Sequence, residues 1–168
     1  ANYDLDPLKV VALVNMGASV TNINILARGQ TSFWRDISFG GNQFTEALQR
    51  EFNLSFDQAE RLKRDQAVDR YGANDARPVL DGVSEIQKTF DFFAATSSEG
   101  PVDEIVLSGG CALTPNLQQV LRERFGVPIE VLDPLRRVHF READFDRDWL
   151  KSISPMLAVA VGLAIRKM

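Results

Sequence analysis

The chain has 168 residues, of which 45% are hydrophobic and 25% are charged, and its formal net charge at pH 7 is −4. This length suits one domain, or one domain with a small insert, and the charge gives no electrostatic reason to expect a nucleic-acid partner. The single cysteine excludes an intrachain disulfide and a metal site built from several thiolates. The longest strongly apolar stretch, residues 156–165, is too short to cross a bilayer, so we expect no direct membrane insertion.

The first third of the chain predicts three strands joined by short turns. Residues 9–14 form a nearly continuous apolar run, which is typical of a buried strand. Residues 21–27 place Ile23, Ile25 and Ala27 on one face. A glycine-containing turn follows, and residues 32–37 alternate again. Such a series predicts an antiparallel meander.

The hydrophobic period then changes from that of strands to that of helices. Over residues 42–52 the apolar positions recur at helical spacing, at Phe44, Ala47, Leu48 and Phe52. A second helix follows, with Ser55 as its N-cap and Gln58 as the capping-box partner. Residues 66–78 are polar and indicate a linker between helices. A long helix then carries one apolar stripe, made of Leu80, Val83, Ile86, Phe90 and Phe93.

The last third alternates strands and helices. The predicted elements are a strand at 104–108, a glycine-rich turn at 109–115, a helix at 113–125, a strand at 128–132, a charged loop at 133–149 and a helix at 155–167. The final helix is apolar on nearly every side, which predicts that it is buried. The whole order predicts an α/β fold of the ribonuclease H-like kind, a mixed five-stranded sheet with helices on both faces.

Glycine-bearing turns stand where a ligand site is expected in such a sheet. One spans residues 15–21, a second spans residues 108–115, and a third, Gly40-Gly41, opens the first helix. Glycine lets a ligand approach the backbone, and the N–H groups of tight turns and helix starts bind anions. Each turn alone is weak evidence and favours a plain chain reversal. Together they favour a crevice at the ends of the strands.

These motifs resemble a known family. The segments "VNMGASVTNINIL", "GGNQFTEALQREFNLSFDQAERLK" and "EIVLSGGCALTPNLQQVLRERFGVP" resemble the C-terminal half of the PilM family, the actin-like proteins of type IV pilus assembly. The resemblance implies two ribonuclease H-like lobes with ATP and Mg²⁺ between them, of which the sequence contains the second. Residues 1–41 and 79–168 would form that lobe, and residues 42–78 a small helical subdomain inserted over the nucleotide.

The resemblance also implies which residues bind the nucleotide. The amides of Gly17, Ala18 and Ser19 would face the β- and γ-phosphates, within a phosphate-binding set of Asn15, Met16, Gly17, Ala18, Ser19 and Thr21. The nucleoside-binding set would be Gly40, Gly41, Glu60, Lys63, Gly109, Gly110, Cys111 and Ala112. Taken without the resemblance, Glu60 and Lys63 lie three residues apart on one helix face and predict an ordinary surface ion pair. We interpret Cys111 as a small apolar filler rather than a nucleophile.

Asn15 departs from the pattern of this family, whose second phosphate loop usually begins with an aspartate that orients water around the metal. An amide keeps one acceptor but loses the charge, and its NH₂ group donates. A hydrogen bond to a charged group is worth about 1.5–3 kcal/mol, so the loss would slow hydrolysis by roughly tenfold to a hundredfold or more. We expect no confident catalytic residue and no direct metal ligand, with Asn15 reaching Mg²⁺ through water at most. Restoring the carboxylate by Asn15→Asp is expected to raise phosphate release.

The function that follows is an ATP-binding scaffold on the cytoplasmic face of the bacterial inner membrane. The resemblance implies the cytoplasmic tail of PilN as a partner, held mainly by the first lobe, together with the pilus assembly ATPases and platform proteins. Self-association is a further expectation. The loop at 133–149, with Phe140, Phe145 and Trp149, is either such a contact or a solvated loop packed by its own aromatic residues. The alternatives are an active ATPase or phosphotransferase and an FtsA-like division protein.

Overall fold

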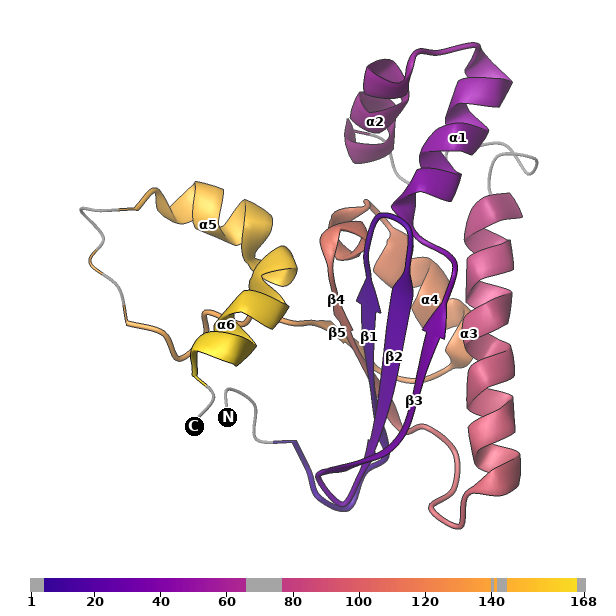
Figure 1. The fold of residues 1–168 in the computed structure, drawn as a ribbon, viewed down its shortest axis with the longest axis vertical. Helices are drawn as coiled ribbons and strands as arrows, with labels where there is room; N and C mark the ends of the chain where they lie inside the picture. The colour runs from indigo at the N-terminus through magenta and orange to yellow at the C-terminus, as the bar shows by residue number, and fades with distance from the viewer. Residues whose placement is uncertain (1–4, 66–76, 140, 142–144, 166–168) are drawn as a thin grey trace.

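The computed structural model describes residues 5–65, 77–139, 141 and 145–165, and contains one mixed sheet (Figure 1). Its five strands lie in the order β3-β2-β1-β4-β5. The β1–β2 and β2–β3 pairs are antiparallel, whereas β1–β4 and β4–β5 are parallel. The strands are β1 (Val11–Met16), β2 (Thr21–Ala27), β3 (Gln30–Ile37), β4 (Glu104–Ser108) and β5 (Ile129–Val131). The predicted α/β sheet is therefore confirmed.

The helices follow the predicted order with some changes of boundary. They are α1 (Gly41–Phe52), α2 (Phe56–Asp65), α3 (Arg77–Thr96), the 3-10 helix η2 (Gly110–Leu113), α4 (Leu117–Phe125), α5 (Arg147–Ile153), the 3-10 helix η4 (Ser154–Leu157) and α6 (Ala158–Ala164). Most of the predicted linker, residues 66–76, lies outside the described residues. The capping box before α2 is confirmed, since Ser55 N–H donates to Gln58 Oε1 and Gln58 N–H donates to Ser55 Oγ.

Several predicted boundaries are wrong for physical reasons. The charged loop predicted at 133–149 ends earlier, because Asp146 accepts from the N–H groups of Asp148 and Trp149 and so caps the start of α5. The helix predicted at 113–125 starts later, because Thr114 precedes Pro115 and is extended, with φ −67° and ψ 124°. The first strand covers 11–16 rather than 9–14, because Asn15 and Met16 continue its pairing with β2. That shift brings Asn15 into the sheet, directly opposite Asn22 on β2 and Ser108 on β4.

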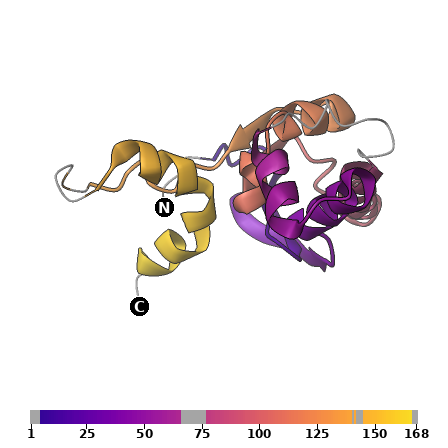
Figure 2. The same cartoon turned by 90° about the horizontal axis from the view of Figure 1, so that it is seen from above.

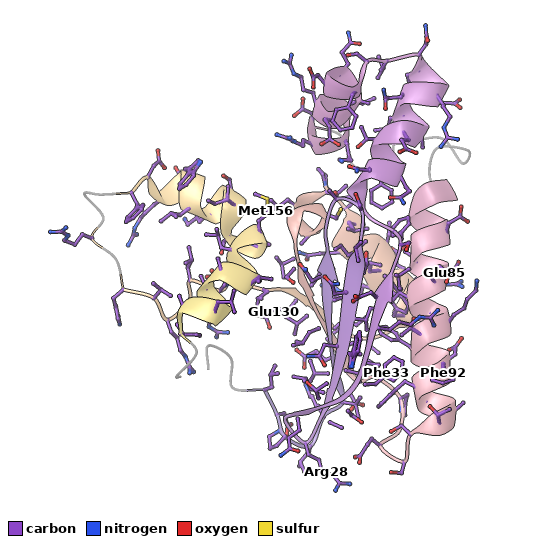
Figure 3. All side chains as sticks on the ribbon, in the orientation of Figure 1. Arg28, Phe33, Glu85, Phe92, Glu130 and Met156 are labelled. Atoms are coloured by element: carbon purple, nitrogen blue, oxygen red, sulfur yellow. The ribbon has the colours of Figure 1, made fainter. Side chains whose placement is uncertain are left out.

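The hydrophobic core lies on one face of the sheet. The alternating residues of β1, Ala12, Val14 and Met16, point to this face together with Ile23 and Ile25 of β2. The apolar stripe of α3 and the inner side of α4 cover it, through Val83, Ile86, Phe90, Phe93, Leu117 and Leu121. Figure 3 shows Phe33 of β3 against Phe92 of α3, and their ring centroids are 5.9 Å apart. The apolar residues that alternate along the strands and those that recur at helical spacing in α3 and α4 therefore pack together in one cluster.

The last helices do not pack as predicted. Figure 2 shows α3 and α4 on one side of the sheet, while α5 and α6 stand clear of it on the other. No residue of α6 is buried, and Val159 and Leu163 are 61% and 65% exposed. The prediction of a buried final helix is wrong for the described part of the chain. An apolar sequence favours burial, but burial needs a partner surface. Here η4, rather than α6, contacts the turn after β4, through the hydrogen bond from Gly109 N–H to Pro155 O at 2.9 Å.

Phe52, predicted as part of the apolar face of α1, is 47% exposed at the end of that helix. The helix is buried at its other end instead, through Phe44, Thr45 and Leu48. The hairpin of α1 and α2 stands at the top of the sheet in Figure 1, next to the carboxyl ends of β1, β3 and β4. Its first turn lies against the sheet edge, and its tip reaches into solvent.

Gly82 in α3 packs directly on Phe39 and gives a test of this arrangement. A Cβ atom added there would lie 2.0 Å from the Phe39 ring. We expect Gly82→Ala to lower the free energy of unfolding by about 1–3 kcal/mol in urea denaturation, because overpacking outweighs the better helix propensity of alanine. The matched control is Gly162→Ala in α6, where an added Cβ meets nothing within 4 Å. It should be neutral or stabilising, and equal losses in both variants would contradict this packing.

Candidate functional site

Four segments meet at the carboxyl edge of the sheet, and they are the ones that carry the predicted site residues. The turn after β1 holds the start of α1 through two backbone hydrogen bonds, from Gly41 N–H to Gly17 O (3.0 Å) and from Asn42 N–H to Ala18 O (2.8 Å). Cys111 Sγ donates to the same Gly17 carbonyl at 3.2 Å, which brings in η2. Lys63 of α2 reaches Gly41 O at 3.2 Å.

Glycine is required at two of these contacts because the backbones approach too closely for a side chain. A Cβ at Gly40 would lie 2.6 Å from the carbonyl groups of Gly17 and Ala18. Gly109 has φ +87°, and its Cβ would lie 2.4 Å from Met16 O. The glycines therefore close the loops against one another as well as leaving the backbone accessible.

The turn at residues 17–20 offers fewer free amides than the three predicted. Gly17 N–H donates to Val20 O at 3.0 Å within the turn. The N–H groups of Ala18 and Ser19 have no partner among the described residues. Ser19 Oγ accepts from Asn42 Nδ2 at 3.1 Å, so the side chain belongs to the contact with α1. An anion at this turn would therefore meet two adjacent backbone donors.

Met16 and Thr21 support this turn from inside. Both are buried, Met16 in the core and Thr21 through a hydrogen bond from its Oγ1 to Phe39 O at 2.8 Å. Their side chains present no polar atom to solvent. They shape the loop, whereas the predicted phosphate contacts fall to the backbone between them.

Glu60 and Lys63 form a half-buried cluster rather than an exposed ion pair. The Lys63 ammonium donates to Glu60 Oε1 (2.5 Å), Thr45 Oγ1 (2.8 Å) and Gly41 O (3.2 Å). An ammonium group has three donors, so all of them are used. Thr45 Oγ1 also bonds Glu60 Oε1. The cluster ties α2 to the first turn of α1, and it leaves Glu60 Oε2, 3.8 Å from an Arg64 nitrogen, as the freer acceptor.

Burial raises the pKa of both Glu60 and Cys111, and a different effect opposes it at each residue. Burial alone raises the pKa of Glu60, but the hydrogen bonds from Lys63 and Thr45 outweigh it and the net pKa is lowered. Burial raises the pKa of the Cys111 thiol to about 11, against the opposing effect of the Lys63 charge. Glu60 is thus held as a carboxylate and Cys111 as a neutral thiol, which supports the interpretation of Cys111 as a filler.

The glycine-rich turn after β4 presents small residues. Cys111 and Ala112 are buried, whereas Gly110 has open space except for Met156, whose sulfur would lie 3.7 Å from an added Cβ. Figure 3 shows Met156 pointing from η4 toward this turn. A flat ligand ring could therefore lie against backbone at Gly110 with Met156 beside it.

Asn15 lies in a row of polar side chains that crosses four strands. Ser108 Oγ donates to Asn15 Oδ1 (3.3 Å), Asn15 Nδ2 donates to Asn22 Oδ1 (3.1 Å), and Asn22 Nδ2 donates to Asp36 Oδ1 (2.8 Å). We call these four residues the amide ladder. Sequence reasoning missed Asn22 and Asp36, because their alignment with Asn15 depends on strand register, which local patterns do not reveal.

The donor groups at this edge fit an anion better than a metal ion. Among the described residues there is no group of three or more His, Cys, Asp or Glu side chains that could hold a metal. Backbone amides at Ala18 and Ser19 suit phosphate oxygens, whereas both polar atoms of Asn15 already have partners. The described residues therefore suit a phosphate group, and further ligands of a Mg²⁺ ion would have to come from outside this edge.

None of the helices in the described residues combines the length and the hydropathy that a membrane span needs.

The sheet order and the helical hairpin at its carboxyl edge define this chain as a ribonuclease H-like lobe of the actin-like class. A solved example is MreB5 of Spiroplasma citri bound to AMPPNP, with a TM-score of 0.64 and 15% identity, covering 96% of this chain and 54% of that one. The chain belongs to the family of the type IV pilus assembly protein PilM, whose model matches residues 4–168.

Two further similarities bear on the length of the chain. The structure of a PilM–PilN type IV pilus biogenesis complex matches with a TM-score of 0.80 and 32% identity, covering 95% of this chain and 46% of that chain. The ethanolamine utilization protein EutJ of Escherichia coli (strain K12) is 25% identical over 123 residues, which is 73% of this chain and 41% of EutJ. This chain thus spans less than half the length of both proteins.

The chemical state of Cys111 can be tested directly, because it is the single cysteine of the chain. With a pKa of about 11, the thiolate is scarce at pH 8 and becomes abundant only as the pH approaches that value. We expect DTNB to react at pH 8 at least about a hundredfold more slowly than in the urea-unfolded chain. The unfolded chain is the control, and complete labelling within the mixing time in native buffer would contradict the buried thiol.

Proposed function

We propose that this chain is the second lobe of a PilM-type scaffold in the type IV pilus assembly platform, and that it binds ATP and Mg²⁺ together with a first lobe. The observation that carries the nucleotide part is the convergence of the turn after β1, the start of α1, the Glu60–Lys63 corner and the turn after β4 at one sheet edge. Family membership supports the pilus part.

Each segment would have a distinct contact with the nucleotide. The free amides of Ala18 and Ser19 would bind phosphate oxygens, and Glu60 Oε2 would accept from a ribose hydroxyl. The purine would lie against the backbone at Gly109 and Gly110. Lys63, whose three donors are used within the protein, would act by holding Glu60 and α1 in place rather than by contacting ATP. Bound Mg²⁺ would neutralise charge on the phosphates.

Hydrolysis would be weak or absent. Position 15 carries an amide, and both of its polar atoms are occupied by Ser108 and Asn22. It therefore has no negative charge with which to orient water around a metal ion. This argues against the alternative of an active ATPase or phosphotransferase.

The site would be completed by the other half of the protein. This chain corresponds to 46% of the PilM chain in the PilM–PilN complex. The exposed apolar side chains of α5 and α6, which include Trp149, Val159 and Leu163, form the kind of surface that another lobe would cover. We place the scaffold on the cytoplasmic face of the inner membrane, where assembly ATPases and platform proteins would bind it. Phe145, just before α5, and Trp149, in its first turn, are exposed and suit such a contact, whereas Phe140 lies outside the described residues.

Nucleotide binding should require both lobes. We expect isothermal titration to give micromolar ATP binding for a two-lobe PilM-type protein containing this chain, and little heat for the chain alone, because half of the phosphate and metal ligands are missing. AMP should bind the two-lobe form at least about tenfold more weakly than ATP if the amides of Ala18 and Ser19 hold the outer phosphates. Equal affinity for AMP and ATP would contradict that assignment.

The pilus role should be visible as recognition of a PilN tail. One solved relative is a PilM–PilN complex. We propose that most of the tail-binding groove belongs to the first lobe. We expect a PilN tail peptide to be retained by the two-lobe protein and weakly or not at all by this chain alone, with a scrambled peptide as control. Failure of the two-lobe protein to retain the peptide would count against the pilus assignment. Full retention by this chain alone would place the groove in the second lobe.

A further inference from the structure

The amide ladder has a direction that its chemistry fixes. Its four members are directly paired across neighbouring strands, Ser108 with Asn15, Asn15 with Asn22, and Asn22 with Asp36. Each adjacent pair is joined by one side-chain hydrogen bond, of 3.3, 3.1 and 2.8 Å in that order. All the protons in the row point the same way, from β4 toward β3.

Asp36 sets this direction. An ionised carboxylate has acceptors and no proton to give, so Asn22 must turn its Nδ2 toward Asp36. The other end of the Asn22 amide, the carbonyl Oδ1, then faces β1. Residue 15 must donate a hydrogen bond to that oxygen, and asparagine does so. At its far side Asn15 Oδ1 accepts from Ser108, whose hydroxyl can donate or accept.

We propose that Asp36, two strands away, determines that residue 15 carries an amide. Residue 15 is the first residue of the predicted phosphate-binding turn, residues 15–21. A carboxylate at position 15 would meet the carbonyl of Asn22. Turning the Asn22 amide over would move the conflict, because its carbonyl would then meet Asp36. Two acceptors at hydrogen-bond distance repel each other, so positions 15 and 36 accept one carboxylate between them in this ladder. Asp36 is a positioning residue in this account, since it acts on the loop through Asn22.

The ladder changes what restoring an aspartate at position 15 would do. Asn15→Asp alone breaks the ladder, whereas Asn15→Asp combined with Asp36→Asn reverses it. In the reversed ladder Asn22 Nδ2 donates to the new carboxylate, and the amide at position 36 donates to Asn22 Oδ1. The consequence for hydrolysis rests on the proposed function, but the coupling between the two positions does not.

The test is a double-mutant cycle on the purified protein. Because Asn22 and Asp36 are exposed and water screens part of the repulsion, we expect Asn15→Asp to lower Tm by about 1–4 °C. Asp36→Asn should change it little, and the double variant should regain most of the loss. The matched control pairs Asn15→Asp with Asp91→Asn. Asp91 also accepts from a side-chain amide, that of Gln87 at 2.7 Å, but it lies on α3, which covers the opposite face of the sheet. The control makes the same charge change and should rescue nothing.

A second measurement reads the ladder direction itself. In NMR spectra of the ¹⁵N-labelled protein, the side-chain amide protons of Asn22 should give NOEs to the β protons of Asp36. In the double variant these NOEs should move to residue 15. If Asn15→Asp alone does not fold, recovery of folded protein in the double variant replaces the Tm comparison.

The outcomes separate the ladder from the proposed function. Additive Tm effects, rescue by the Asp91 control, or unmoved Asn22 NOEs would overturn the coupling. In a two-lobe form, phosphate release should rise roughly tenfold or more in the double variant, and by a smaller factor in Asn15→Asp, whose ladder is broken. Restored Tm and moved NOEs with unchanged phosphate release would uphold the ladder, and would instead remove the proposed role of charge at position 15 in hydrolysis.

Discussion

The close backbone contact between the turn after β1 and the start of α1 is the constraint on which the rest of the site depends. Gly41 and Asn42 N–H, which an isolated helix start would offer to an anion, are satisfied by the carbonyl groups of Gly17 and Ala18. The contact fixes the helical hairpin on the sheet edge, and it leaves the N–H groups of Ala18 and Ser19 without a partner among the described residues. It is possible because Gly40 has no side chain to separate the two backbones.

The polar groups that already have hydrogen-bond partners then determine which atoms of the Glu60–Lys63 cluster and its adjoining turns can bind a ligand. Lys63 would be costly to bury alone, but three acceptors surround its ammonium group and hold it as structural support. The Gly17 carbonyl accepts both the Gly41 amide and the Cys111 thiol, so the two glycine-bearing turns and α1 share one atom. The backbone N–H groups of Ala18 and Ser19 have no such partner in the described part of the chain. They suit an anionic ligand, which they would hold by hydrogen bonds rather than by a positively charged side chain.

The two faces of the sheet differ in their chemistry. On the packed face β1 and β2 present Ala12, Val14, Ile23 and Ile25 to α3 and α4. On the other face, residues of the same strands form the amide ladder that ends at Asp36. Because strand side chains alternate, the two faces are built from adjacent residues. The charge at position 15, in the predicted phosphate-binding turn, is thus linked to Asp36 on the edge strand β3.

The sequence by itself determined the strands, the capping box at Ser55, the stripe of α3 and the glycine positions, because these depend on local periodicity, caps and turns. Only the tertiary structure decided where Glu60 and Lys63 point, that Gly17 N–H is used within its turn, and that Asn22 and Asp36 belong to the site. Those features depend on register and on contacts between segments far apart in the chain. The exposure of α6 is of the same kind, since hydrophobicity states a preference for burial whereas packing decides whether a partner is present.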